Sequence, residues 1–241
     1  MPTVFITGCS SGLGLEFARQ YLELGWSVIA TCRQPERASA LANLRSPRLQ
    51  ILSLDVGDGQ SVRAVSTSLH GTPIDVLINN AGVLGGTLPQ QTLGSLDFEL
   101  GQAVMDVNCF GPLRISEALL PNVESGTQKK IIGIASGNGS LTATSREAAG
   151  GMYFYRTSKA AMHIALLALS RDVLSRGIAV RLLSPGLVDS NFGDSAKIDK
   201  SKIKGMLTPQ QSVSKMIPLI DSLIVSESGS WKRYTGDDVP W

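Results

Sequence analysis

The stretch Thr7-Gly8-Cys9-Ser10-Ser11-Gly12-Leu13-Gly14 decides the fold of this chain. It follows the apolar run Val4-Phe5-Ile6, which predicts a β-strand, and it opens residues 13–24, where apolar side chains recur at helical spacing. Glycines at such a junction let the backbone turn tightly and approach a pyrophosphate, while the first N–H groups of the helix face the anion. An ordinary turn is the alternative, because a chain rich in glycine contains such spacings by chance. The residues predicted to hold a dinucleotide here are Gly8, Ser10, Ser11, Gly12, Leu13 and Gly14.

The rest of the chain repeats this alternation of short apolar runs and longer helical patterns. Predicted strands are 4–6, 26–30, 49–54, 75–78, 130–135, 178–183 and 231–234, and predicted helices are 13–24, 59–70, 99–120, 153–175 and 208–223. This order is typical of a parallel sheet covered on both faces, whose strands are continuous apolar runs. We therefore predict an α/β fold of the Rossmann type, with a doubly wound parallel sheet of about seven strands in an α/β/α sandwich. Residues 1–241 are expected to form a single domain.

Composition places the chain among ordinary folded proteins. Hydrophobic residues make up 43% of its 241 residues and charged residues 17%, below the usual charged fraction of about 25%, so intrinsic disorder is excluded. The net charge is +2 and no run of Lys or Arg exceeds a pair, so we expect no nucleic-acid partner. No apolar stretch of about 18 residues predicts a membrane span, and no charged leader predicts secretion.

Cysteine and histidine are too scattered to predict a metal site. Cys9, Cys32 and Cys109 show neither a disulfide framework nor metal-ligand spacing. They fit a reducing compartment, so we expect a cytoplasmic protein. His70 and His163 lie far apart without a nearby acidic or cysteine cluster, and surface or packing positions are expected for both.

Side chains with a chemical role are expected just after the strands, because such sheets bind ligands beyond their carboxyl ends. Arg33 follows the strand at 26–30, where folds that bind NAD usually carry an acidic residue for the ribose 2′-hydroxyl. The planar guanidinium of Arg33 is instead suited to grip a 2′-phosphate. The sequence therefore favours NADP(H) over NAD(H), and a solvated loop arginine is the alternative.

Two further turns at strand ends are candidates for the cofactor site. Asn79-Asn80-Ala81-Gly82 ends the strand 75–78 and forms either an ordinary turn or a wall beside the adenosine. Residues 184–190 end the strand 178–183 and are placed to form a wall beside the nicotinamide. The cofactor residues predicted from these turns are Asn80, Ala81, Gly82, Pro185, Gly186, Val188 and Ser190.

Tyr155 and Lys159 lie four residues apart in the predicted helix 153–175 and therefore share one of its faces. A phenol with a pKa of about 10 is a poor acid or base at neutral pH, and an adjacent ammonium lowers that pKa by favouring the phenolate. The pair predicts a proton-transfer site in which Lys159 activates Tyr155. A helix-surface pair without a chemical role is the alternative.

Ser136 and Asn108 fit the same site. Ser136 directly follows the strand 130–135, where its hydroxyl is placed to hydrogen-bond a substrate carbonyl, although loop and capping serines are common there. Asn108 lies inside the predicted helix 99–120 among apolar residues, which is an unfavoured place for asparagine. A polar side chain in such a place needs a partner or a water. Asn108 is therefore interpreted either as holding a proton-relay water or as lying on an exposed face.

Taken together, these residues resemble the short-chain dehydrogenase/reductase family along essentially the whole chain. The motifs that carry the resemblance, in the order and approximate spacing of the family, are Thr7–Gly14, Asp55-Val56, Asn79–Gly82, Asn108, Ser136, Tyr155–Lys159 and Pro185-Gly186. Within the family the chain is most similar to the sniffer and C-factor-like carbonyl reductases, through Gly150–Lys159 and Tyr234–Trp241. The resemblance adds Asp55 and Val56 to the cofactor site.

The resemblance also implies a role for each residue of the predicted catalytic set. Tyr155 would donate a proton to the carbonyl oxygen, and Lys159 would lower the pKa of Tyr155 and bind the nicotinamide ribose. Ser136 would orient the carbonyl, and Asn108 would hold a water of the proton relay. Hydride would pass from the cofactor to the substrate carbon, so the protein supplies position and electrostatics.

Three features depart from the usual pattern of the family. Ala135 replaces the first of two serines that often follow the fifth strand, and Ser190 stands where threonine is usual. The gap from Ser136 to Tyr155 is long, as in the sniffer-like group. Residues 191–206 occupy the position of the family's substrate lid. This segment is short and polar, which favours an open pocket that accepts many carbonyl compounds.

We therefore expect an NADPH-dependent oxidoreductase that reduces an aldehyde or ketone, a small-molecule partner, to an alcohol. The alternatives are a dinucleotide-binding regulatory or signalling protein of the C-factor type, and a biosynthetic alcohol dehydrogenase with one dedicated substrate. The helix from residue 155 onward is apolar on nearly every side. Members of the family often pair through this helix and the long one before it, so a homodimer or homotetramer is expected. A monomer in which a loop or tail covers this face is the alternative.

Overall fold

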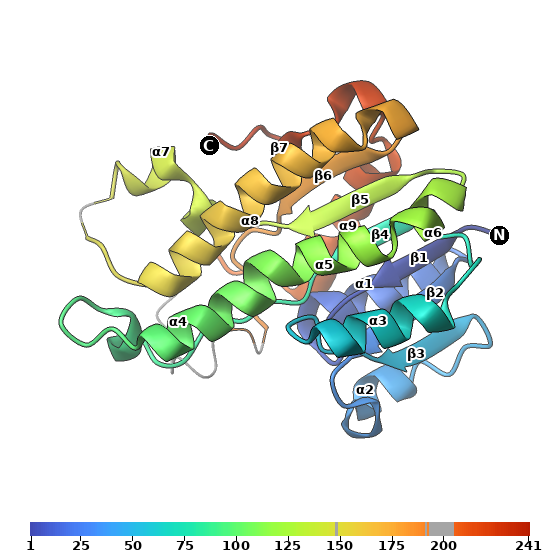
Figure 1. Ribbon diagram of the computed structural model, residues 1–241, viewed down its shortest axis with the longest axis horizontal. Helices are drawn as coiled ribbons and strands as arrows, with labels where there is room; N and C mark the ends of the chain where they lie inside the picture. The colour runs from blue at the N-terminus through green and yellow to red at the C-terminus, as the bar shows by residue number, and fades with distance from the viewer. Residues whose placement is uncertain (148, 191, 193–204) are drawn as a thin grey trace.

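The seven strands of the described part of the chain lie parallel in one sheet, in the order β3-β2-β1-β4-β5-β6-β7 (Figure 1). The computed structural model describes residues 1–147, 149–190, 192 and 205–241. The strands are β1 (Thr3–Ile6), β2 (Ser27–Cys32), β3 (Leu49–Ser53), β4 (Val76–Asn79), β5 (Lys130–Ile134), β6 (Ala179–Ser184) and β7 (Ser230–Arg233). Each lies within two residues of a predicted strand, so the predicted Rossmann-type sheet is confirmed.

The order of the strands places a switch point at the centre of the sheet. In β1, Val4 pairs with Val28 of β2 on one side and with Val76 of β4 on the other. From β1 the chain builds outward through β2 and β3, then returns to β4 and builds outward in the opposite direction. The connections therefore diverge at the carboxyl ends of β1 and β4, which is where such sheets bind ligands.

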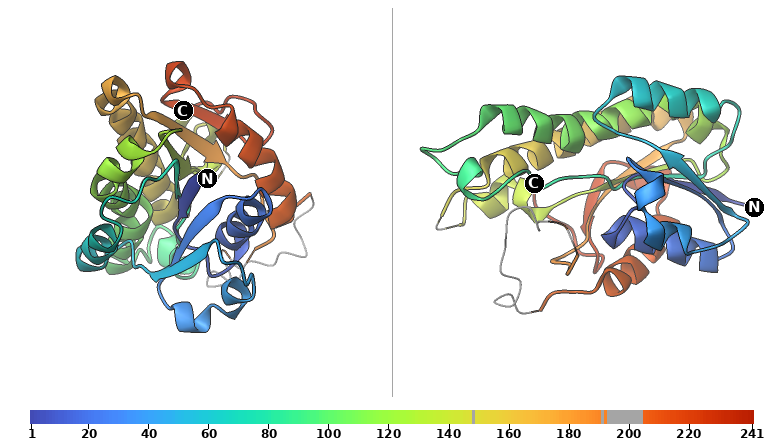
Figure 2. Two further views of the ribbon diagram at one scale, coloured as in Figure 1. Left: turned by 90° about the vertical axis from the view of Figure 1, so that its right-hand side faces the viewer. Right: turned by 90° about the horizontal axis from the view of Figure 1, so that it is seen from below.

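Helices cover both faces of the sheet, as the two views of Figure 2 show. The α-helices of the described residues are α1 (Gly12–Glu23), α2 (Ser39–Ala42), α3 (Gly59–Ser68), α4 (Phe98–Met105), α5 (Gly111–Ala118), α6 (Leu120–Ser125), α7 (Leu141–Thr144), α8 (Tyr153–Asp172) and α9 (Pro209–Asp221). One core contains Phe17 of α1 and residues of α9, and the other contains Leu166 of α8 and residues of α3 and α5. Val4 and Phe5 belong to opposite cores and are both fully buried, which explains the continuous apolar sequence of β1.

The predicted helix 99–120 is interrupted in the structure, so its prediction as one α-helix was wrong. α4 gives way to a π-helical segment at Asp106–Phe110, and α5 follows. Pro112 has no N–H and cannot make the α-helical hydrogen bond to the carbonyl of Asn108, four residues earlier. Single π-helical turns of this kind occur mostly inside α-helices and often at functional sites. The wider turn here contains Asn108, whose side chain is fully buried.

Other helix boundaries agree with the sequence to within a few residues. α8 ends at Asp172, shortly before the predicted end, and a 3₁₀ turn follows. α9 begins with a capping box in which Thr208 Oγ1 accepts from Gln211 N at 3.1 Å and Gln211 Oε1 accepts from Thr208 N at 2.9 Å. The sequence does not predict α2, α6 or α7, because helices of one or two turns show no readable periodicity.

Most of the predicted substrate lid lies outside the described residues. Of residues 191–206, only Phe192, Gly205 and Met206 are described, so the expectation of a short, open lid is not addressed by the structure. In the described ranges, no helix is long and apolar enough to span a membrane. Those ranges also contain no group of three or more His, Cys, Asp or Glu side chains arranged to hold a metal ion.

Candidate active site

A cavity of about 820 Å³ lies at the carboxyl edge of the sheet, over the switch point between β1 and β4. Its lining extends from Arg33, after β2, to Ser136, after β5, and to Tyr155 in α8. All residues predicted for the site line this cavity except Gly14 and Asn108. Small-molecule sites usually have volumes of about 300–1,000 Å³. Predicted residues from the whole length of the chain therefore come together at one place of suitable size.

The glycine-rich turn is packed tightly against the strand ends. Gly8 has a φ of +74°, and a Cβ on Gly14 would lie 2.2 Å from Gly8 O, so both positions require glycine. Asn80 Nδ2 donates to Thr7 O (2.8 Å) and to Gly8 O (3.1 Å). Thr7 Oγ1 in turn accepts from Asn80 N (3.0 Å) and Ala81 N (2.9 Å). These four hydrogen bonds hold the turn after β1 against the turn after β4.

The N-terminus of α1 opens into the same cavity. Ser11 occupies the N-cap position with extended backbone, and its side chain makes no capping hydrogen bond. Ser10 and Ser11 are both exposed and line the cavity. Unpaired N–H groups at the start of a helix carry partial positive charge, so this end of the cavity suits an anion.

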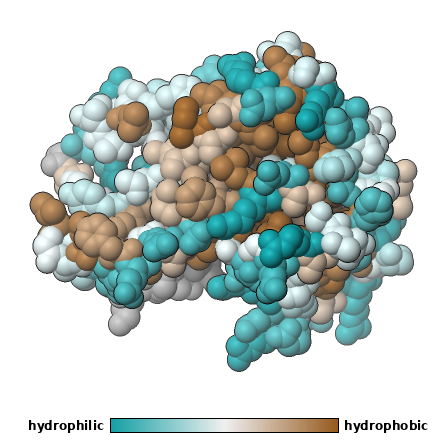
Figure 3. All heavy atoms as spheres, in the orientation of Figure 1, coloured by the Kyte–Doolittle hydropathy of each residue, from teal (hydrophilic) through white to brown (hydrophobic). Residues whose placement is uncertain are grey.

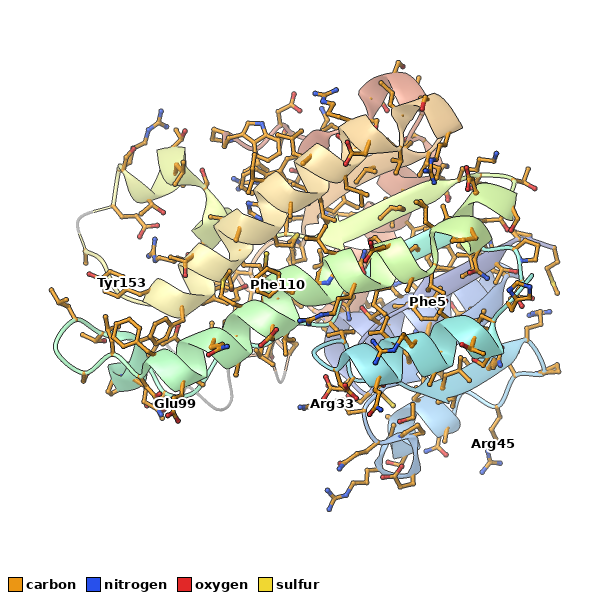
Figure 4. The ribbon with its side chains drawn as sticks, in the orientation of Figure 1. Phe5, Arg33, Arg45, Glu99, Phe110 and Tyr153 are labelled. Carbon is orange, nitrogen blue, oxygen red and sulfur yellow. The ribbon has the colours of Figure 1, made fainter. Side chains whose placement is uncertain are left out.

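Arg33, labelled in Figure 4, is an exposed cation at the end of β2. Its carbonyl accepts from Ser53 Oγ at 3.2 Å, which holds the strand end to β3. The guanidinium makes no hydrogen bond or ion pair with the described residues, whereas that of nearby Arg37 bonds Gln34. The charge of Arg33 is therefore available to an anionic group in the cavity.

Asp55 and Val56 line the cavity on the Arg33 side. Asp55 Oδ1 accepts from Gly57 N at 2.9 Å, so one carboxylate oxygen stabilises its own turn. Val56 is buried and belongs to the core under α3 and α5. Both residues therefore belong to the wall of the cavity, and their contact with a cofactor stays a prediction.

The turn after β6 forms the opposite wall. Pro185 O accepts from Ser212 Oγ at 2.7 Å, which fixes the turn to α9. Val188 forms an isolated parallel bridge with residue 207. Ser190 Cβ lies 3.4 Å from a Cβ placed on Gly12, so this wall contacts the glycine-rich turn from the far end of the sequence.

Asn108 lies fully buried behind the cavity and is held at three points. Its Nδ2 donates to Val83 O (2.8 Å) and to Ser158 Oγ (3.0 Å), and its Oδ1 accepts from Val83 N (2.8 Å). The exposed-face interpretation of Asn108 is therefore wrong. A Cβ on Gly82 would lie 3.3 Å from Asn108 Oδ1 and 3.6 Å from Lys159 Nζ, so these two side chains flank Gly82.

Lys159 and Tyr155 share the inner face of α8, as predicted, and both are buried. Lys159 Nζ donates to Ile134 O at 3.0 Å, and burial lowers the pKa of Lys159 to about 8 because it penalises the ammonium. Burial raises the pKa of Tyr155 to about 12, and the neighbouring Ser136 side chain offsets only part of this rise. The predicted lowering of the Tyr155 pKa is therefore wrong for the chain by itself, since desolvation of the phenolate dominates.

Ser136 connects Tyr155 to the end of β5. Its hydroxyl accepts from Asn138 N at 3.2 Å and lies close enough to the Tyr155 phenol to lower the pKa of Tyr155 slightly. Behind it, Ser136 N donates to His163 Nε2 at 3.4 Å. Burial lowers the pKa of His163 to about 3, so the ring is neutral and Nε2 is an acceptor. His163 packs on Trp231 with ring centroids 4.2 Å apart, so it is the packing residue that was expected.

Several residues that line the cavity are not predicted from the sequence. They come from the loop after β4, the segments after β5 and β6, and the end of β7 with the segment after it, namely Val83, Leu84, Asn138, Ala143, Glu147, Met152, Leu187, Arg233 and Val239. Most are apolar, so their residue type does not distinguish them from core residues. Position after a strand end, the signal that identified Ser136, would also have indicated Val83, whereas Arg233 lies inside the predicted strand 231–234.

The sequence and the structure both match known proteins. Residues 2–201 match the family described as short chain dehydrogenase. The chain is 36% identical over 180 residues to C-signal of Myxococcus xanthus, covering 75% of this chain and 100% of that protein. An NADPH-bound carbonyl reductase from chicken fatty liver superposes with a TM-score of 0.89 at 30% identity, covering 100% of this chain and 99% of that one. The carbonyl reductase Sniffer of D. melanogaster superposes with a TM-score of 0.86 at 26% identity, covering 100% of each chain.

These matches confirm the resemblance drawn from the motifs, including its Sniffer-like and C-factor-like character. They also agree with the geometry, because the matched region contains the glycine-rich turn, Asn108, Ser136, Tyr155 and Lys159. The chain belongs to the short-chain dehydrogenase/reductase family of oxidoreductases.

Proposed function

We propose that the chain is an NADPH-dependent carbonyl reductase that converts an aldehyde or ketone to an alcohol. The observation that carries the proposal is that Ser136 and Tyr155 line the cavity as neighbours, with Lys159 on the same buried face of α8. Two hydroxyl groups that meet at one point suit a carbonyl oxygen on which negative charge develops. Cofactor and substrate would share one cavity, so residues 1–241 are proposed to act as a single domain.

In the proposed reaction, bound NADPH supplies a hydride to the carbonyl carbon of the substrate. Ser136 donates a hydrogen bond to the carbonyl oxygen and orients it. Tyr155 transfers its phenolic proton to that oxygen, so the alcohol has gained one hydride and one proton. Lys159, whose pKa of about 8 leaves it mostly protonated at neutral pH, stabilises the phenolate that remains. Asn108 is proposed to hold the water through which Tyr155 regains its proton.

The residues present fit a dinucleotide phosphate. Gly8 and Gly14 let the backbone and the α1 N-terminus approach a pyrophosphate, and Arg33 is an available cation for a 2′-phosphate. Thr31 and Cys32, which precede Arg33, offer no carboxylate to a ribose 2′-hydroxyl. Titration of the protein with NADPH and NADH tests this part of the proposal. A tighter dissociation constant for NADH would overturn it.

The substrate end of the cavity has mostly apolar walls. Leu84, Met152, Met206 and Val239 line it, and the ring of Phe192 lies 5.7 Å from that of Tyr155 between centroids. We therefore propose carbonyl compounds with an apolar substituent as substrates. A panel of aldehydes and ketones of graded size, assayed at a fixed NADPH concentration, also distinguishes broad acceptance from one dedicated substrate.

The catalytic assignment is tested by Tyr155→Phe. General acid catalysis is worth about 10²- to 10⁴-fold, so kcat should fall by at least two orders of magnitude while the Kd for NADPH stays within about twofold. Tyr153→Phe is the matched control, because Tyr153 begins the same helix but is exposed on its outer side (Figure 4). Turnover by Tyr155→Phe at the rate of Tyr153→Phe would refute the assignment.

The similarity to C-signal favours a second candidate, a dinucleotide-binding protein with a signalling role. The geometry of the Ser136–Tyr155 pair supports catalysis in either case, so the two functions can coexist. Tight NADPH binding without turnover of any carbonyl in the panel would favour a signalling role alone.

We further propose that the chain forms homodimers or homotetramers through α4, α5 and α8. Phe110 is 45% exposed and Ile164 is 62% exposed on these neighbouring helical segments. Figure 3 shows hydrophobic side chains gathered over α5 and α8, and Figure 4 shows Phe110 on that outward side. Apolar surface of this kind favours burial against a second copy. Sedimentation at micromolar concentration tests the proposal, and a monomer would overturn it.

A further inference from the structure

Gln91 is a buried amide in the loop that joins β4 to α4. It ends the short 3₁₀ helix Pro89–Gln91, and its side chain is 0% exposed. It does not line the cavity and therefore does not touch a ligand there. A buried glutamine must find partners for two N–H donors and a carbonyl oxygen, so its contacts show what it holds together.

The side chain of Gln91 joins two walls of the active site. Its Nε2 donates to Leu84 O at 2.9 Å and also to Gly85 O. Its Oε1 accepts from the backbone N–H of Tyr155 at 3.0 Å. Both donors and the acceptor are therefore used, and they connect the loop after β4 to the first turn of α8.

The N–H of Tyr155 needs a partner from outside its own helix. α8 begins at Tyr153, and N–H groups in the first turn of a helix have no acceptor within it. Met152, at the N-cap position, makes no side-chain capping bond, and Arg156 N is the donor that bonds back to Met152 O. Gln91 Oε1 therefore takes the place of a cap at the position of the proposed proton donor.

A second buried amide acts on the same two elements. Asn108 holds Val83 by its N–H and its C=O and bonds Ser158 Oγ in α8, as described above. Gln91 holds the next residues of the loop and bonds α8 one turn earlier, at Tyr155. Leu84, whose carbonyl is bonded by Gln91, packs in one cluster with the Tyr155 side chain. The loop and the helix are thus attached at the tyrosine and again one turn after it.

We propose that Gln91 is a positioning residue that fixes Tyr155 and the Leu84 wall for proton transfer to the substrate. The proposal rests on the proposed carbonyl reduction. Proton transfer requires the phenol within hydrogen-bond reach of the carbonyl oxygen, so a small displacement of the first turn of α8 separates donor from acceptor. The cofactor end of the cavity lies on β1 and β2 and is not held by Gln91.

The first test compares Gln91→Leu with Gln90→Leu. Gln90 belongs to the same turn, but its side chain bonds Thr87 and Asp97 instead of α8. Gln91→Leu should lower kcat by about 10- to 100-fold, the effect of a misplacement of about 1 Å. The Kd for NADPH should stay within about twofold, and Gln90→Leu should keep the wild-type kcat. The assays are run where circular dichroism shows each variant fully folded, so that a loss of stability alone does not lower kcat.

Gln91→Glu provides a second test that depends on pH. A protonated carboxyl group has one O–H donor and one acceptor, so it can bond a loop carbonyl and the Tyr155 N–H together. An ionised carboxylate has no donor and would face the Leu84 and Gly85 carbonyl oxygens. The kcat of Gln91→Glu, relative to wild type at the same pH, should therefore fall as pH rises, and that of Gln90→Glu should not.

A wild-type kcat in folded Gln91→Leu, or a pH-independent ratio in Gln91→Glu, would overturn the positioning role. Failure of the proposed function looks different, because wild-type protein would then reduce no carbonyl of the panel. An added readout is amide hydrogen exchange at Tyr155, which Gln91→Leu should accelerate and Gln90→Leu should not. Unchanged exchange at Tyr155 would also overturn the proposal.

Discussion

Asn108→Leu is the substitution for which the structure predicts the most specific outcome. Asn108 is fully buried, and its loss leaves the N–H and C=O of Val83 without their partners. Each unsatisfied buried group costs about 1–3 kcal/mol, and the apolar leucine, similar in shape, offsets part of this. We expect the free energy of unfolding to fall by about 2–4 kcal/mol, out of a total of about 5–15 kcal/mol for a typical domain.

Asn122→Leu is the matched control. Asn122 is also a buried amide with two donated bonds, to Leu69 O (2.7 Å) and Thr72 O (2.8 Å), but it lies in α6, away from the cavity. Urea denaturation should give similar losses of stability for both variants. Only Asn108→Leu should also lower kcat, by about 100-fold, because only Asn108 holds the cavity wall at Val83 against α8.

The activity per folded molecule decides whether the contacts of Asn108 serve catalysis as well as stability. Both variants are assayed with NADPH and a reducible carbonyl, and the folded fraction is taken from denaturation under the same conditions. Equal activity of the two folded variants would refute the reasoning, since it would mean that the contacts of Asn108 serve stability alone. A loss of activity in Asn122→Leu of the same size would refute it as well.

Two further substitutions test the charges of the site. Arg33→Ala should raise the Kd for NADPH by about 10- to 100-fold, as expected for lost bonds to a charged phosphate, and leave the Kd for NADH within about twofold. Fluorescence titration measures both dissociation constants, with Arg37→Ala as the control. Equal losses of affinity for the two nucleotides would contradict the role of Arg33 at the 2′-phosphate. Lys159→Met should change the pH dependence of the free energy of unfolding. The pKa of Lys159 is about 8 in the folded state and 10.5 ordinarily, so between these pH values the unfolded state binds more protons than the folded state. The contribution of wild-type Lys159 to stability therefore rises by about 3 kcal/mol as pH rises through this window. Urea denaturation measures the free energy of unfolding of both proteins at pH 7 and pH 10. Between these pH values, Lys159→Met should become less stable relative to wild type by most of this amount. An equal difference between the two proteins at both pH values would count against the buried ammonium.

Much of the fold and of the site is readable from local sequence. Apolar runs such as Val4-Phe5-Ile6 predict strands because both faces of this sheet are covered, and all seven predicted strands are found. The spacing of Tyr155 and Lys159 places both on one helical face, and the spacing of Gly8 and Gly14 predicts a tight turn. These signals depend on residues a few positions apart, so one sequence contains them.

The sequence alone therefore determined the parallel sheet, the strand ends at which polar groups gather, and the face of α8 that carries Tyr155 and Lys159. The tertiary structure alone decided the π-helical turn at Asn108, the rise in the pKa of Tyr155 and the bond from Gln91 to the Tyr155 backbone. The physical reason is that desolvation and long-range hydrogen bonds depend on which groups exclude water from one another. A glutamine or a tyrosine has the same sequence neighbours whether it is buried or exposed, so only packing reveals which role it takes.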